Sequence, residues 1–192
     1  DIDADGDLDL FIGGRMLPGA YPSPARSYLL INDGKGIFSD QTDRYLPSLK
    51  ESGMITDALW IDLNKDQYPD LVTAGEWAPV SVWMNSKGVF TDATSKYISF
   101  PSSGWWTRMQ AVDLDGDGDT DIVLGNCGEN TQFKVSGKEP MTITYKDFDG
   151  NGSIDPVLCY FIKGVSYPAA SRDDLTDQLS RVKNRLRFAV EE

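Results

Sequence analysis

The chain has 192 residues, a formal net charge of −12 and no histidine. The acidic balance argues against nucleic acid as a partner, because a phosphate backbone requires a basic face. The absence of histidine removes the commonest general base, the usual zinc ligand and the Ser-His and Cys-His pairs of nucleophilic enzymes. Hydrophobic residues make up 40% of the chain, so we expect a folded protein with a sizeable core.

The chain opens on an acidic segment, 1–9, in which aspartates occupy every odd position and Gly6 the sixth. One tight turn can wrap oxygens at alternate positions around a hard cation, and a glycine at the sixth position allows the sharp bend. We assign residues 1–49 to a repeat unit that lacks the strand found ahead of the later loops, and on that ground we expect the chain to be a fragment. Alternation of apolar and polar residues predicts strands in this unit at 9–15, 27–32 and 37–42.

A complete unit follows at residues 53–95. Its loop, 62–70, keeps the oxygen-bearing positions but has Gln67 where glycine is expected. Tight turns join four predicted strands, so we expect one antiparallel sheet here. These strands are predicted at 54–62, 71–77, 80–85 and 89–92.

Two further units carry the same loop. The third unit, 104–134, has its loop at 113–121 after a predicted strand at 104–112, and its outer strands are abbreviated. The fourth unit, 140–169, has its loop at 147–155. Strands in this last unit are predicted at 141–146, 155–161 and 165–168.

The period changes after the fourth unit. Ser171 has the pattern of a helix N-cap with an acidic residue three positions on. Apolar residues then recur at helical spacing, at Leu175, Leu179, Val182 and Leu186. We therefore predict an amphipathic helix over 171–190 that packs on the sheets or bridges to a following segment.

The loops are not of the helix-loop-helix calcium type, which ends in a bidentate glutamate at position twelve. Strand-like runs follow each loop, and position twelve is Ile12, Thr73, Leu124 or Leu158. The ninth-position aspartate must therefore supply the closing carboxylate, and position seven offers its backbone carbonyl. We predict up to four structural Ca²⁺ ions, with ligands at Asp1, Asp3, Asp5, Asp7, Asp9, Asp62, Asn64, Asp66, Tyr68, Asp70, Asp113, Asp115, Asp117, Asp119, Asp121, Asp147, Asp149, Asn151, Ser153 and Asp155.

The acidity of the chain is concentrated in these loops. They contain five, three, five and three acidic residues in turn, which is 16 of the 30 in the chain. Four bound Ca²⁺ ions would bring the net charge from −12 to −4. Four copies of one oxygen spacing favour metal binding over the alternative of solvated acidic turns.

The loops begin at positions 1, 62, 113 and 147. A four-strand unit that recurs about every 40–50 residues predicts a β-propeller. The expected fold class is therefore all-β, a partial β-propeller of about four blades of antiparallel strands with calcium-binding loops. A C-terminal α-helix completes the single domain.

Two pairs of residues leave alternatives open. Cys127 and Cys159 lie in strand-like segments, where buried free thiols are favoured over a disulfide. Trp77 and Trp105 lie near loop ends, where core packing is favoured over an exposed platform for a sugar or a protein.

The loop-and-strand unit, together with the run Asn32-Asp33-Gly34-Lys35-Gly36-Ile37-Phe38, resembles FG-GAP/VCBS repeats. A narrower resemblance, to VCBS-repeat proteins of the ASPIC/UnbV type, covers nearly the whole chain and departs at Gln67 and Cys127. It implies an integrin-α-like propeller of about seven blades with structural calcium, in an exported or cell-surface bacterial protein. The segments that carry this narrower resemblance are 75–79, 104–106, 125–128 and 147–156.

Two classes of function remain. The first is a non-catalytic, calcium-binding module that mediates adhesion by binding a protein or glycan at the cell surface. The second is the propeller portion of a calcium-dependent, lyase-like polysaccharide-degrading enzyme. The absence of histidine and of a mixed charge cluster outside the loops favours the first, so we assign no catalytic residue. We expect an extracellular, cell-surface or periplasmic location, no membrane span in this stretch, and the remaining blades in the full-length chain.

Overall fold

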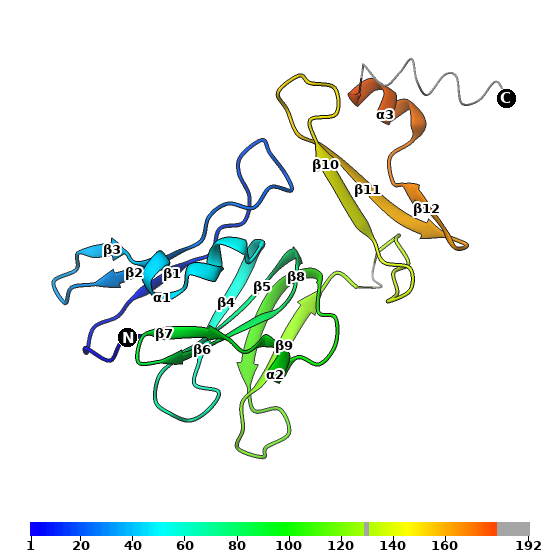
Figure 1. The fold of residues 1–192 in the computed structure, drawn as a ribbon. Coiled ribbons are helices and arrows are strands. Elements are labelled where there is room, and N and C mark those ends of the chain that lie inside the picture. The colour runs from blue at the N-terminus through cyan, green and yellow to red at the C-terminus, as the bar shows by residue number, and fades with distance from the viewer. Residues whose placement is uncertain (129–130, 180–192) are drawn as a thin grey trace. The chain divides into compact units, whose positions relative to one another are not determined.

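A computed structural model describes residues 1–128 and 131–179 of the chain. It divides into two compact units, one formed by Asp1–Met16 with Pro24–Cys127 and the other by Leu17–Ser23 with Gly128–Glu192. The described residues form mostly antiparallel β-sheets with few helices, which confirms the expected β class (Figure 1). Within that part of the chain, no helix is both long and apolar enough to cross a membrane. The division into blades stays a prediction.

The first sheet has three strands in the order β1-β2-β3. Two of its predicted strands are too long. The first ends before Gly14, whose N–H donates to the Ser27 hydroxyl instead of a neighbouring strand. The third ends before Thr42, because the Asp40 carboxylate accepts the Thr42 N–H at 3.0 Å and turns the chain into a helix. The elements here are β1 (Leu10–Ile12), β2 (Tyr28–Asn32), β3 (Phe38–Asp40), α1 (Thr42–Tyr45) and η1 (Pro47–Glu51).

The second sheet contains the complete four-strand unit that the sequence predicts, with β5 paired to β4 on one edge and to β6 on the other. Strand β8 also pairs with the end of β5, at Glu76 and Ala78, and β9 pairs with β8. The predicted strand bounds are confirmed to within about two residues. The elements are β4 (Met54–Ile61), β5 (Asp70–Ala78), β6 (Ser81–Ser86), β7 (Val89–Asp92), α2 (Thr94–Tyr97), β8 (Gly104–Val112) and β9 (Asp121–Asn126).

The short helices α1 and α2 were not predicted, and they occupy equivalent places in the first two repeat units. Each begins at a threonine whose N–H donates to an aspartate two residues earlier. The hydroxyl of Thr42 accepts the Leu29 N–H, and the hydroxyl of Thr94 accepts the Val82 N–H. The two units are therefore alike beyond their loops and strands.

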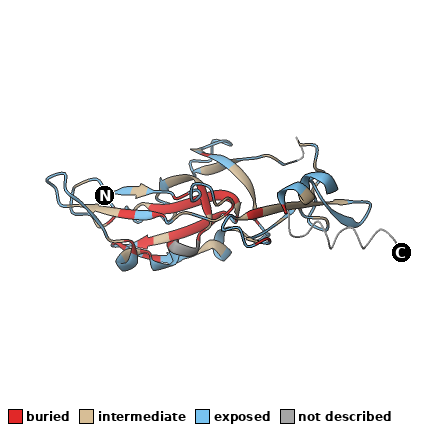
Figure 2. Cartoon of the chain, turned by 90° about the horizontal axis from the view of Figure 1, so that it is seen from above, coloured by how far each residue is buried: buried red, intermediate tan, exposed pale blue. Residues whose placement is uncertain are grey.

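The core of the first compact unit lies on both faces of β5. Successive side chains of a strand point to opposite faces of the sheet. Leu71 packs in one cluster with Ile2, Leu29, Trp83 and Phe90, whereas Val72 packs in the other with Val82 and Met109. Strand β5 is accordingly buried along nearly its whole length (Figure 2).

The described residues of the other unit form a three-stranded antiparallel sheet in the order β10-β11-β12 and the helix α3. Ser171 caps this helix in a reciprocal capping box with Asp174, as the sequence predicts. The helix ends at Gln178 instead of running through Leu179, whose φ of −105° and ψ of 70° are not helical. The remainder of the predicted helix lies outside the described residues. The elements are β10 (Thr142–Lys146), β11 (Asp155–Ile162), β12 (Val165–Pro168) and α3 (Arg172–Gln178).

Both cysteines are free thiols, half-buried instead of fully buried. Cys127 belongs to the first compact unit and Cys159 to the second.

A buried carboxylate lies where β5 meets β8. The side chain of Glu76 is 6% exposed, and one of its oxygens pairs with the half-exposed guanidinium of Arg15. The second oxygen, Oε2, is buried and accepts no hydrogen bond from the described part of the chain. Removing Arg15 would therefore leave a buried charge without its counter-ion.

We expect Arg15→Ala to lower the free energy of unfolding by about 2 kcal/mol, the typical cost of an uncompensated buried polar group. Urea denaturation measures this change. The control is Lys65→Ala, which removes an ion pair with Asp119 between two largely exposed side chains and should leave stability unchanged. Equal effects of the two substitutions would contradict the prediction.

Candidate metal centres

The four acidic loops each lead directly into a strand. Loop 1 (residues 1–9) precedes β1, and loop 2 (62–70) joins β4 to β5. Loop 3 (113–121) joins β8 to β9, and loop 4 (147–155) joins β10 to β11. Loops 2 and 3 lie at the same end of their sheet (Figure 1), where the Lys65 ammonium donates to Asp119 at 2.6 Å. That hydrogen bond raises the pKa of Lys65 and lowers the pKa of Asp119.

The same three hydrogen bonds recur in all four loops. The N–H of position two donates to the ninth-position aspartate at 2.8–3.0 Å. The N–H of position six donates to the first aspartate at 2.8–3.2 Å. The N–H of position seven donates to the fifth-position side chain at 2.7–3.2 Å. These bonds fold four different sequences into one loop geometry.

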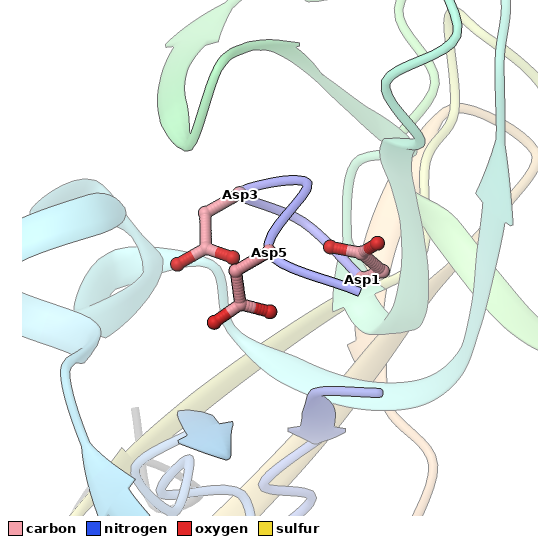
Figure 3. Close-up of side chains that lie close together, drawn as sticks. All are labelled: Asp1, Asp3 and Asp5. Atoms are coloured by element: carbon pink, nitrogen blue, oxygen red, sulfur yellow. The ribbon is translucent and has the colours of Figure 1, made fainter. Parts of the chain in front are cut away.

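Carboxylate oxygens converge in three of the loops. In each triad, one oxygen of every member lies within 4.8 Å of the others. Figure 3 shows the triad of loop 1, with the carboxylates of Asp3 and Asp5 side by side. Among the described residues, loop 2 forms no such triad, although its aspartates keep the predicted positions. The triads are Asp1, Asp3 and Asp5; Asp113, Asp115 and Asp121; and Asp147, Asp149 and Asp155.

Loop 1 also contains oxygens that accept no hydrogen bond from the described residues. Asp3 Oδ1 and Asp7 Oδ1 are both buried and unpaired. Partial burial raises the pKa of Asp7, and smaller increases come from the neighbouring negative charges of Asp5, Asp9, Asp3 and Asp33. A buried, unpaired oxygen among like charges is costly unless a cation neutralises it. The donor set of loop 1 thus fits a divalent ion that prefers oxygen ligands.

The other predicted ligands are placed as follows. Asp9 accepts the N–H groups of Ile2 and Asn32, and it lies outside the loop 1 triad. Asp117 and Asn151 accept the position-seven N–H groups of loops 3 and 4. The position-seven residues Tyr68, Asp119 and Ser153 were predicted to act through their backbone carbonyls, and their N–H groups, like that of Asp7, are fixed by the fifth-position side chain.

Loop 2 differs from the others in the residues at its left-handed positions and in its side-chain pairing. All four loops have a positive φ at positions four and six, but only loop 2 has non-glycine residues at both, Lys65 and Gln67, with φ of 61° and 73°. The side-chain amide of Asn64 donates a hydrogen bond to the Asp66 carboxylate at 2.9 Å, so these two predicted ligands bind each other. Asp70 is fully buried, and burial raises its pKa despite hydrogen bonds from Asn85 and Leu63.

We expect Asp115→Ala to weaken calcium binding in loop 3 more than Gln67→Gly alters binding in loop 2. Asp115 belongs to a carboxylate triad, so its loss removes a candidate ligand. Glycine at position 67 relieves about 1 kcal/mol of left-handed strain but adds a similar entropy to the unfolded chain. Calorimetric titration with calcium compares the two variants, and a larger effect of Gln67→Gly would contradict the prediction.

Sequence reasoning missed two asparagines that support the ninth-position aspartates. Asn32 donates its backbone N–H to Asp9 at 3.1 Å, and Asn85 donates its own to Asp70 at 2.7 Å. Asn32 is the last residue of β2 and Asn85 the last but one of β6, and each side-chain carbonyl accepts a glycine N–H from the hairpin turn that follows. The shared position of asparagine before the two hairpin turns was the signal that could have revealed them.

Comparison with known families decides the affiliation of the chain. The model of the FG-GAP-like repeat matches residues 1–73 and 62–124. The chain belongs to this family. Each FG-GAP-like match begins at the first position of one loop and ends three residues after the next, so the family repeat and the acidic loops share one register. Comparison with curated proteins gives no match.

Proposed function

We propose that this FG-GAP-like chain is a non-catalytic, calcium-binding β-propeller module that mediates adhesion by binding a protein or a glycan. We further propose that it belongs to an exported or cell-surface bacterial protein of the ASPIC/UnbV type. The observation that carries the calcium proposal is the hydrogen-bond pattern shared by the four loops, with oxygens converging in three of them.

Calcium is the ion that best suits these loops. The candidate ligands are carboxylates, amide and hydroxyl oxygens and backbone carbonyls, which Ca²⁺ prefers in sets of six to eight. In loops 1, 3 and 4 the converging aspartates would hold the ion, and in loop 2, which has the same three hydrogen bonds, Asp62 and Asp70 would do so. The position-seven carbonyl would be a further ligand in each loop. Bound calcium would neutralise carboxylates that otherwise repel one another, so that metal binding is coupled to folding.

The packing of the first compact unit supports a propeller. Blades of a propeller are antiparallel sheets that stack face to face around an axis. The opposite faces of β5 belong to different core clusters, one shared with the first repeat unit and the other with β8 and β9. A sheet that is covered on both faces by neighbouring repeats is what such stacking requires.

The enzymatic alternative, a polysaccharide lyase, would need acid–base residues outside the metal loops, for which the sequence offers Glu76 and Glu129. Glu76 is buried and paired with Arg15, and Glu129 lies outside the described residues. Trp77 and Trp105 are half-buried and contact each other as a tilted pair, with ring centroids 5.6 Å apart and an interplanar angle of 34°. Such a pair presents only part of its aromatic surface to a sugar.

A glycan array run in parallel with a lyase assay, both with added calcium, tests the proposed function. We expect glycan or protein binding that EDTA abolishes, without release of unsaturated sugar products. Asp115→Ala serves as the matched variant with one loop impaired. Formation of unsaturated products would overturn the non-catalytic assignment in favour of a lyase.

A further inference from the structure

One buried side chain connects two of the acidic loops. Asn85, at the end of β6, is 1% exposed. Its amide nitrogen donates to the carbonyl of Pro69 in loop 2 at 3.1 Å and to the carbonyl of Ile2 in loop 1 at 2.8 Å. Its side-chain carbonyl accepts the Gly88 N–H at 2.8 Å. Both amide hydrogens and the carbonyl are therefore satisfied, which fixes the orientation of the amide.

Each end of this connection lies next to a candidate calcium ligand. In loop 2, the Asn85 backbone N–H donates to Asp70, and Pro69 immediately precedes that aspartate. In loop 1, Ile2 lies between Asp1 and Asp3, and its own N–H donates to Asp9 at 2.8 Å. Displacement of either loop backbone would thus be transmitted through the Asn85 amide to the other.

Asn32 provides an internal comparison, because it holds the same position in the first repeat unit. Its amide nitrogen donates to the Leu8 carbonyl at 3.3 Å, and its carbonyl accepts the Gly36 N–H at 3.1 Å. Within the described residues these bonds stay inside its own repeat unit. Asn85 makes the equivalent bonds and adds the one to Ile2, so that extra bond is specific to the junction between the first two units.

The packing around Ile2 strengthens the same junction. The Ile2 side chain is 1% exposed and lies in a cluster with Leu71 and Trp83 of the second repeat unit, 53–95. The second repeat unit therefore holds Ile2 through both its carbonyl and its side chain. Positions one to three of loop 1 depend on the second repeat unit for their conformation.

We propose that Asn85 is a positioning residue through which loop 2 supports calcium binding in loop 1. This inference rests on the proposed calcium function and adds that the first two sites are linked. Calcium held by loop 2 orders Asp70 and Pro69, which fixes Asn85 and thereby the Ile2 carbonyl beside Asp1 and Asp3. Because linkage is reciprocal, occupancy of loop 1 favours binding in loop 2 by the same factor.

Glycine amide signals in the full chain, labelled with ¹⁵N-glycine, report individual loops during a calcium titration. The Gly6 N–H donates to Asp1 in loop 1, and the Gly118 N–H donates to Asp113 in loop 3. We expect Asn85→Ala to raise the calcium midpoint of Gly6 about fivefold or more, the lower end of measured couplings between sites. The midpoint of Gly118 should not change.

A second substitution, Asp62→Ala, removes a candidate ligand of loop 2 at an exposed position and keeps the test valid if Asn85→Ala fails to fold. It should raise the Gly6 midpoint in the wild-type chain and in an Asn32→Ala background, but not in an Asn85→Ala background. If Gly6 and Gly118 still respond to calcium but the Gly6 midpoint is unchanged in Asn85→Ala or in Asp62→Ala, the proposed link is overturned. If no glycine signal responds to calcium, the calcium function itself fails.

Discussion

Removal of divalent cations with EDTA is expected to lower the melting temperature of the protein by tens of degrees. The loops hold 16 acidic residues, and in three loops the carboxylates converge to within 4.8 Å. A ligand present at a hundred times its dissociation constant stabilises the folded state by about 2.7 kcal/mol per site. Three such sites would supply about 8 kcal/mol, and each kcal/mol corresponds to roughly 2–4 °C or more in a domain of this size.

Thermal unfolding followed by circular dichroism measures this effect in EDTA, in EDTA followed by excess calcium, and in magnesium alone. Calcium should restore the melting temperature, whereas magnesium should restore less, because Mg²⁺ demands a smaller octahedral site and keeps several waters. An unchanged melting curve in EDTA would show that the loops carry no ion that matters for folding.

The strands were the most predictable part of the fold. Those with long alternating patterns, such as β4 and β8, follow the predicted bounds closely. The helices α1 and α2 were missed, because four residues are too few to show a helical period. Their signal is chemical: an aspartate and a threonine two residues apart, at Asp40 and Thr42 and again at Asp92 and Thr94.

The candidate ligands were predictable for a similar reason, since their spacing is local. The triads of loops 1, 3 and 4 consist of residues from the predicted sets. The roles of Asn32 and Asn85 were not predictable from loop spacing, because these residues follow the aspartates they support by 23 and 15 positions. Only the pairing of β1 with β2, and of β5 with β6, brings them to the loops.

The buried position of Asp70 leads to the other large effect. Asp70 is fully buried and accepts the Leu63 N–H at 2.9 Å and the Asn85 N–H at 2.7 Å. Asp121 holds the same ninth position in loop 3, is half-buried and accepts the Leu114 N–H at 2.9 Å. Alanine at either position removes one candidate calcium ligand, so the two variants share the loss of a metal contact.

At saturating calcium, we expect Asp70→Ala to lower the free energy of unfolding by about 3 kcal/mol more than Asp121→Ala. The difference arises because Asp70→Ala leaves two N–H groups inside the protein without an acceptor, each at a cost of roughly 1–3 kcal/mol. Water can replace the carboxylate at the more accessible loop 3. Urea denaturation of both variants measures the difference, and equal losses would mean that the ninth aspartate stabilises the fold chiefly through the ion.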